Sequence, residues 1–124
     1  MMQLLYVAAG GAVGALLRYG VVLLSQNLWG RDFPYGTLLV NVLGSLLIGL
    51  AYVWIVERLA LGDAWRLAFM VGVLGAFTTF SSFSIETLQL VERGAALAAL
   101  SNILLNVSLC LVACWLGLLA ARQF

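Results

Sequence analysis

Residues 72–86 read Gly-Val-Leu-Gly-Ala-Phe-Thr-Thr-Phe-Ser-Ser-Phe-Ser-Ile-Glu, inside a chain that is otherwise almost wholly apolar. This stretch combines two glycines, a run of hydroxyl side chains and three phenylalanines. Hydroxyl groups can solvate an ion, glycines leave the backbone accessible, and the edges of phenylalanine rings are weakly positive. In a membrane protein, such a stretch is a candidate ion pathway.

The composition indicates that the solvent of this chain is a lipid bilayer. Of its 124 residues, 65% are hydrophobic and only 9% are charged, and the mean hydropathy is +1.12. A soluble domain of this length cannot bury so much apolar surface. We therefore expect one all-α integral membrane domain that covers residues 1–124.

Four segments are candidate membrane spans, since a spanning helix needs about 20 mostly apolar residues. They cover approximately residues 4–24, 36–56, 67–91 and 95–120. The third segment is longer than a crossing requires, which predicts that its helix is interrupted near residues 75–80. The chain shows no internal repeat, so a protein of this kind obtains symmetry only by forming oligomers.

The orientation in the membrane is poorly specified. With four spans both termini lie on one side, and the arginine counts of the two sides are almost equal. Arg58, Arg66 and Arg122 lie on the side of the termini, whereas Arg31, Arg93 and, near a span end, Arg18 lie opposite. Either a small excess orients the protein, or the chain inserts both ways and forms an antiparallel dimer. We favour dual insertion, because the positive-inside rule normally leaves a visible bias.

Asn41 lies early in the second span, where an amide without a partner costs roughly 2–7 kcal/mol. Its side chain must therefore face protein or water. Two readings stay open, an interhelical hydrogen bond and donation from the NH2 group to an anion.

Polar residues also follow one face of the fourth span. Asn102, Asn106, Cys110 and Cys114 recur at four-residue spacing, and Ser101 and Ser108 lie nearby. The amides and hydroxyls either join helices or form a ladder of donors along a pore, and we favour the ladder. The cysteines are expected to pack, because a disulfide between them is strained and two thiols leave a metal site incomplete.

Phe80 and Phe83 lie three residues apart on one helix face, with Ser81 and Ser82 between them. Aromatic residues at this spacing usually pack against other helices. The interleaved hydroxyl groups favour a different reading, an aromatic gate edged by hydrogen-bond donors.

Two charged residues, Arg18 at the end of the first span and Glu86 in the third, are further candidates. Arg18 either extends its charge to the membrane surface or concentrates anions at a pore mouth. Glu86, one turn beyond the phenylalanines, either pairs with an arginine or faces a vestibule.

Several function classes find little support in these residues. The chain has no lysine, no histidine and no basic stripe, and it carries no nucleophile–base pair, phosphate-binding loop or metal cluster. We therefore expect neither an enzyme nor a nucleic-acid-binding protein. An exporter of cationic drugs needs a carboxylate within the membrane, and spans one, two and four have none at their centres. A non-transporting subunit, whose polar groups only join helices, remains an alternative.

Three motifs, in order, resemble those of the Fluc (CrcB) family of fluoride channels. They read Gly10-Gly-x-x-Gly-Ala-x-x-Arg-Tyr19, Gly36-Thr-Leu-x-Val-Asn41-x-x-Gly44 and Gly72-x-x-Gly75-x-Phe-Thr-Thr-Phe80-Ser-Ser-Phe83-Ser-x-Glu86. The third motif is the most specific, and the similarity covers essentially the whole chain. The fourth span differs, since family members often carry tyrosine and serine where this chain has Asn102 and Asn106.

The resemblance implies a passive fluoride channel that exports cytoplasmic fluoride through the bacterial inner membrane. It implies an antiparallel, dual-topology homodimer with two pores, each lined by both subunits. The expected fluoride path comprises Phe80, Phe83, Asn41, Ser81, Ser82, Asn102, Asn106 and Ser108. By similarity, the interrupted third helix offers the carbonyls of Gly75 and Thr78 to a structural sodium ion on the two-fold axis.

Overall fold

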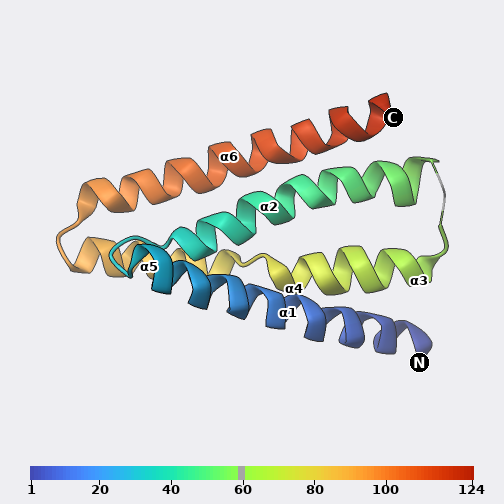
Figure 1. Cartoon of the computed structure of the whole chain (residues 1–124), viewed down its shortest axis with the longest axis horizontal. Coiled ribbons are helices and arrows are strands. Elements are labelled where there is room, and N and C mark those ends of the chain that lie inside the picture. Colours follow the sequence, from blue (N-terminus) through green and yellow to red (C-terminus); the bar gives the residue numbers. More distant parts are fainter. Residues whose placement is uncertain (59–60) are drawn as a thin grey trace.

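The computed structural model describes residues 1–58 and 61–124, and all regular structure within them is helical. Four helical spans are long and apolar enough to cross a membrane: Met2–Trp29, Tyr35–Arg58, Asp63–Glu92 and Ala96–Gln123. The expected four-span, all-helical fold is confirmed. Successive spans run in opposite directions, so both termini lie at the same end of the bundle (Figure 1).

Each span consists of one or more helical segments. The first span is α1 (Met2–Trp29) and the fourth is α6 (Ala96–Gln123). In the second span, α2 (Tyr35–Ala51) continues into the π-helical segment η1 (Tyr52–Arg58). The third span contains α3 (Asp63–Trp65), the π-helical η2 (Arg66–Leu74), α4 (Gly75–Phe77) and α5 (Phe80–Glu92).

The helices extend beyond the apolar segments that predict them. α1 continues to Trp29, and Gly30, with φ 82°, then turns the chain toward α2. Gly94, with φ 78°, makes the turn from α5 to α6. Glycine adopts this left-handed conformation without a steric penalty. The placement of Arg18 near a helix end is therefore wrong, because α1 continues to Trp29 and Arg18 lies well inside it.

Glycines allow neighbouring spans to approach until their backbones touch. A Cβ atom added at any of four glycines would overlap a backbone carbonyl of the facing helix. These contacts join Gly10 to Ala68, Gly14 to Val73, Gly49 to Cys114, and Gly117 to Leu46. The first two hold α1 against the third span and the last two hold α2 against α6, as small residues do in membrane helix pairs.

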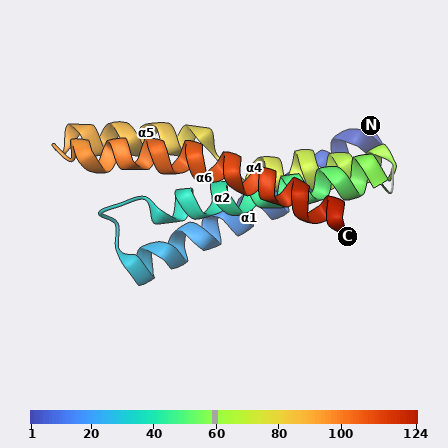
Figure 2. The ribbon, with the colours of Figure 1, turned by 90° about the horizontal axis from the view of Figure 1, so that it is seen from above.

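The third span changes its backbone conformation at two threonines. α4 ends at Phe77, after which Thr78 (φ −86°, ψ 160°) and Thr79 (φ −153°, ψ 116°) are extended, and α5 begins at Phe80. Thr79 caps α5, because its Oγ1 accepts a hydrogen bond of 3.1 Å from the backbone N–H of Ser82. From this point α5 runs beside α6, while α1 and α2 diverge from that pair (Figure 2).

Candidate functional site

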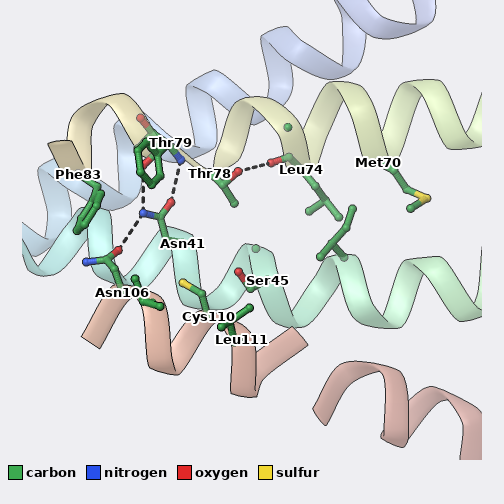
Figure 3. Close-up of a pocket in the computed structure, with 15 residues that line it drawn as sticks. Asn41, Ser45, Met70, Leu74, Thr78, Thr79, Phe83, Asn106, Cys110 and Leu111 are labelled. Atoms are coloured by element: carbon green, nitrogen blue, oxygen red, sulfur yellow. Dashed lines mark hydrogen bonds between the residues drawn. The ribbon is translucent and has the colours of Figure 1, made fainter. Parts of the chain in front are cut away.

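A groove of about 470 Å³ lies beside the two extended threonines, between α2, the third span and α6 (Figure 3). Its polar lining consists of Asn41, Ser45, Thr78, Thr79, Asn106 and Cys110, and its remaining lining residues are apolar. None of the lining residues is charged. An ion in this groove would therefore be solvated by neutral donors, carbonyls and ring edges.

The two phenylalanines lie together at this groove. The ring centroids of Phe80 and Phe83 are 5.3 Å apart, with the ring planes inclined by 58°. Phe83 is only 8% exposed, whereas Phe80 is 78% exposed on the surface of the chain. The two rings thus differ in role, since Phe83 packs within the chain and Phe80 is free to contact another molecule.

The Asn41 side chain pairs with the peptide groups of Thr79. The backbone N–H of Thr79 donates to Asn41 Oδ1 at 2.8 Å, and Asn41 Nδ2 donates to the Thr79 carbonyl at 3.1 Å. In an uninterrupted α-helix this N–H would donate to the carbonyl of Gly75. Asn41 therefore replaces a helical partner where α4 ends, which satisfies a backbone donor in an apolar environment.

A relay of hydrogen bonds continues from Asn41 through α6 to α5. Asn41 Nδ2 donates to Asn106 Oδ1 at 3.0 Å, and Asn106 Nδ2 donates to the carbonyl and to Oδ1 of Asn102 at 2.9 and 3.0 Å. Asn102 Nδ2 donates to Thr87 Oγ1 at 2.9 Å, and Thr87 Oγ1 donates to the Phe83 carbonyl at 2.7 Å. We call Asn41, Asn106, Asn102 and Thr87 the asparagine relay.

The serines predicted for the pathway lie outside the groove. Ser81 and Ser82 belong to the first turn of α5, where Ser81 Oγ is 3.3 Å from Thr79 Oγ1 and Ser82 donates its N–H to the cap. Ser108 is exposed on α6, and its hydroxyl donates to the carbonyl of Leu104 in the same helix. Within one chain the structure brings none of the three into contact with the groove.

Glu86 lines a second cavity, of about 610 Å³, whose other lining residues come from α1, the loop after it, α2, the second half of α5 and Arg93. Thr37 Oγ1 donates to Glu86 Oε1 at 2.8 Å, whereas Oε2 is buried and accepts no hydrogen bond from the described residues. Arg31 and Arg93 also line this cavity, but no ion pair joins them to Glu86 in the part of the chain described. Arg18 is half-buried and lines neither cavity.

Gly75 and Thr78, the residues expected to offer carbonyls to a cation, both line the groove. Because the Thr79 N–H donates to Asn41, the Gly75 carbonyl loses its usual helical donor. Across residues 1–58 and 61–124, no group of three or more acidic, cysteine or histidine side chains could hold a metal. Carbonyl oxygens are ligands that sodium and other hard cations accept.

Three polar residues of this region escape the sequence reading. Thr37 and Ser45 flank Asn41 at four-residue spacing, so the periodicity that marks Asn102 and Asn106 on the fourth span could also have found them. Thr79 is a residue type that is common at helix N-caps, and here its hydroxyl accepts from the backbone N–H of Ser82, three residues later. Its pairing with Asn41 has no local signal, because the two residues are 38 positions apart.

These features define a multi-pass helical membrane protein with an uncharged, partly polar groove beside a change of backbone conformation. Comparison with known proteins identifies the family. Residues 5–118 match the family model described as CrcB-like protein, Camphor Resistance (CrcB). The chain therefore belongs to the CrcB family.

Relatives in several bacteria are named fluoride-specific ion channel FluC. The protein of Coxiella burnetii is 47% identical over 123 residues, which cover 98% of this chain and 99% of the relative. That of Shewanella amazonensis is 50% identical over 117 residues, 94% of each chain. A longer relative from Methylococcus capsulatus is 50% identical over 125 residues, and this chain spans 54% of it. The family is thus one of ion channels and not of enzymes.

Proposed function

We propose that this protein is a passive, fluoride-selective channel that exports cytoplasmic fluoride through the bacterial inner membrane. The observation that carries the proposal is the groove of Figure 3, where the Phe83 ring and the amides of Asn41 and Asn106 gather beside Thr79 without a charged side chain. The names of the relatives support fluoride as the transported ion.

The physical task of such a channel is to replace the water around a small, strongly hydrated anion. Amide and hydroxyl groups donate hydrogen bonds, and ring edges add weak positive potential. A full charge in the path would hold the bare anion too tightly, and conduction requires both entry and exit. Larger halides fit the path less well and gain less from each donor. Transport is passive, because the groove holds no carboxylate that could couple it to a proton.

The path that we propose uses the residues of the groove first and those of the vestibule at its end. Phe80, Phe83 and Asn41 form its narrow part, and Ser81 and Ser82, in the first turn of α5, would join it only in a larger assembly. Both hydrogens of Asn41 Nδ2 already have acceptors, so fluoride would displace one of them. Asn106 lines the groove beside Asn41, and Asn102 lies behind Asn106. Glu86 lines the second cavity, which we propose as the vestibule of the path. Arg18 lines neither cavity of the single chain, so Arg18 and Ser108 would reach the path only where another subunit completes it.

The occupant that we propose for the open side of the groove is a second, antiparallel copy of the chain. Phe80 projects from the chain with 78% of its surface exposed, which supports a site that another subunit completes. The distribution of arginines supports insertion in both orientations, since Arg31 and Arg93 lie at the end of the bundle opposite the termini. Such a homodimer would contain two pores, each lined by both subunits.

We also propose a structural sodium ion on the two-fold axis of this dimer, held by the carbonyls of Gly75 and Thr78 from each subunit. The exposed backbone at Gly75 and the diversion of the Thr79 N–H to Asn41 support this assignment. A hard cation would satisfy carbonyls that the end of α4 leaves without helical donors.

Purified protein in liposomes is expected to carry fluoride out, driven by a potassium potential, while chloride stays inside. A fluoride electrode follows the efflux, and protein-free liposomes give the background. No efflux above this background would leave the alternative of a non-transporting subunit, in which the polar groups only join helices. Efflux of a cationic drug instead of fluoride would favour an exporter.

Replacing sodium on both sides with a bulky organic cation is expected to abolish fluoride efflux and to dissociate the dimer. The reason is that a large cation cannot approach the carbonyls closely enough to satisfy them. Chemical crosslinking in the membrane measures the dimer, and potassium serves as a control cation of intermediate size. Full flux and a stable dimer in thoroughly sodium-free buffer would contradict the carbonyl site.

A further inference from the structure

The asparagine relay assigns a role to Asn102 and Asn106, two buried residues of α6. We infer that Asn102 and Asn106 are positioning residues, which fix the Asn41 amide and the first turn of α5 and do not themselves donate to the anion. This inference rests on the proposed function, because the position that they fix is that of the groove. It is carried by the direction, burial and end points of the relay.

The amide groups of both residues donate to protein atoms. Asn106 Nδ2 donates to two oxygens of Asn102, and Asn102 Nδ2 donates to Thr87 Oγ1. Asn102 has no exposed surface and Asn106 is 5% exposed. Asn41 is only partly buried, so of the three amides it is the one most accessible from the groove.

Asn106 and the Thr79 peptide together fix which way the Asn41 amide faces. Asn106 Oδ1 and the Thr79 carbonyl both accept from Asn41 Nδ2, and Asn41 Oδ1 accepts from the Thr79 N–H. A flipped Asn41 amide would oppose its oxygen to Asn106 Oδ1 and its NH2 group to the Thr79 N–H. Both contacts would be repulsive, and the apolar surroundings offer no water to relieve them.

Both ends of the relay are anchored at the start of α5, at its N-cap Thr79 and at Phe83. It is anchored at one end to the backbone of Thr79 and at the other, through Thr87, to the carbonyl of Phe83. Phe80 lies between these two anchors and contacts the Phe83 ring. Every donor points along the relay from Asn41 toward the Phe83 carbonyl, an arrangement in which successive hydrogen bonds polarise one another.

The test is a mutant cycle of Asn102→Leu, Asn106→Leu and the double variant, with fluoride efflux normalised to folded protein. We expect the fluoride efflux rate of each single variant to fall about tenfold, which is the factor that corresponds to the loss of one hydrogen bond of this kind. We expect the double variant to be no slower than the more affected single variant, because either substitution already breaks the relay. The matched control is Ser101→Ala on the same helix, whose hydroxyl donates only to Leu97.

Losses that multiply in the double variant would overturn the inference, because independent donors to fluoride behave in that way. Lower thermal stability of the variants with unchanged efflux would also overturn the inference, because the relay would then only stabilise the packing of the helices. Asn106→Ser provides a rescue, since serines of α6 donate to the carbonyl four residues earlier and would there reach Asn102. We expect it to conduct faster than Asn106→Leu.

Hydrogen–deuterium exchange separates this inference from the proposed function. In Asn106→Leu, a peptide covering residues 78–83 is expected to exchange about tenfold faster than in the unmodified protein, because the Thr79 N–H loses its fixed acceptor. The same result with no fluoride efflux from the unmodified protein would reject the channel and retain the relay. Fluoride efflux from the unmodified protein, together with unchanged exchange in Asn106→Leu, would retain the channel and reject the relay.

Discussion

Replacing Phe80 with isoleucine is expected to slow fluoride efflux by roughly tenfold while the chain stays folded. Isoleucine fills much of the same space but has no ring edge. Contacts of aromatic edges contribute about 0.5–1.5 kcal/mol, and a change of about 1.4 kcal/mol in the barrier changes a rate tenfold. Phe80 is 78% exposed, so its loss removes little packing within the chain. A fluoride electrode measures the efflux, and size-exclusion chromatography measures the folded protein.

Phe83 and Phe69 complete this experiment. Phe83→Ile is expected to slow efflux to a similar degree and also to lower thermal stability, because the Phe83 ring is 8% exposed and packs within the chain. Phe69→Ile is the matched control, a partly buried phenylalanine of the same span that does not line the groove. Unchanged efflux in both Phe80→Ile and Phe83→Ile would remove the rings from the path.

Substituting Gly10 with alanine is expected to lower the stability of the protein so far that most of it no longer folds. The new methyl group would overlap the carbonyl of Ala68, and backbone on that side cannot move unless α1 separates from η2. Overpacking of this kind typically costs about 1–3 kcal/mol where side chains can yield, and more where only backbone faces the methyl group. Thermal unfolding in detergent and the yield of monodisperse protein measure the effect.

Gly20→Ala, on the same helix, is the control. Apart from the adjoining residues and backbone of α1 itself, no described atom lies within 4 Å of a Cβ at Gly20. This variant is therefore expected to unfold at the temperature of the unmodified protein or slightly above it, since alanine favours helix. Equal stability of Gly10→Ala and Gly20→Ala would show that α1 and the third span do not pack as closely as described.

Hydropathy and motif order predicted the coarse structure of this protein well. Four apolar segments gave four helices with both termini at one end, and the third motif drew attention to the two threonines where the backbone becomes extended. The helix ends were less predictable, because α1 continues through polar residues until Gly30 provides a turn, which moved Arg18 into the helix interior.

The partners of the polar residues could not be predicted from spacing alone. Asn41 and Thr79 pair across 38 positions, and Thr37 and Glu86 across 49, so both contacts depend on how the spans pack. Spacing placed Asn102 and Asn106 on one face, but it did not reveal that both amides point inward. It also gave no sign that the Ser108 hydroxyl turns back to its own helix.

The large exposed fraction of Phe80 has a consequence for how activity depends on protein abundance. If one chain owns only half of the site, a newly inserted copy is inert until it collides with a copy that crossed the membrane the other way. Mass action then makes the number of working sites rise with the square of copy number when copies are scarce. Resistance to a toxic ion would consequently set in steeply with expression.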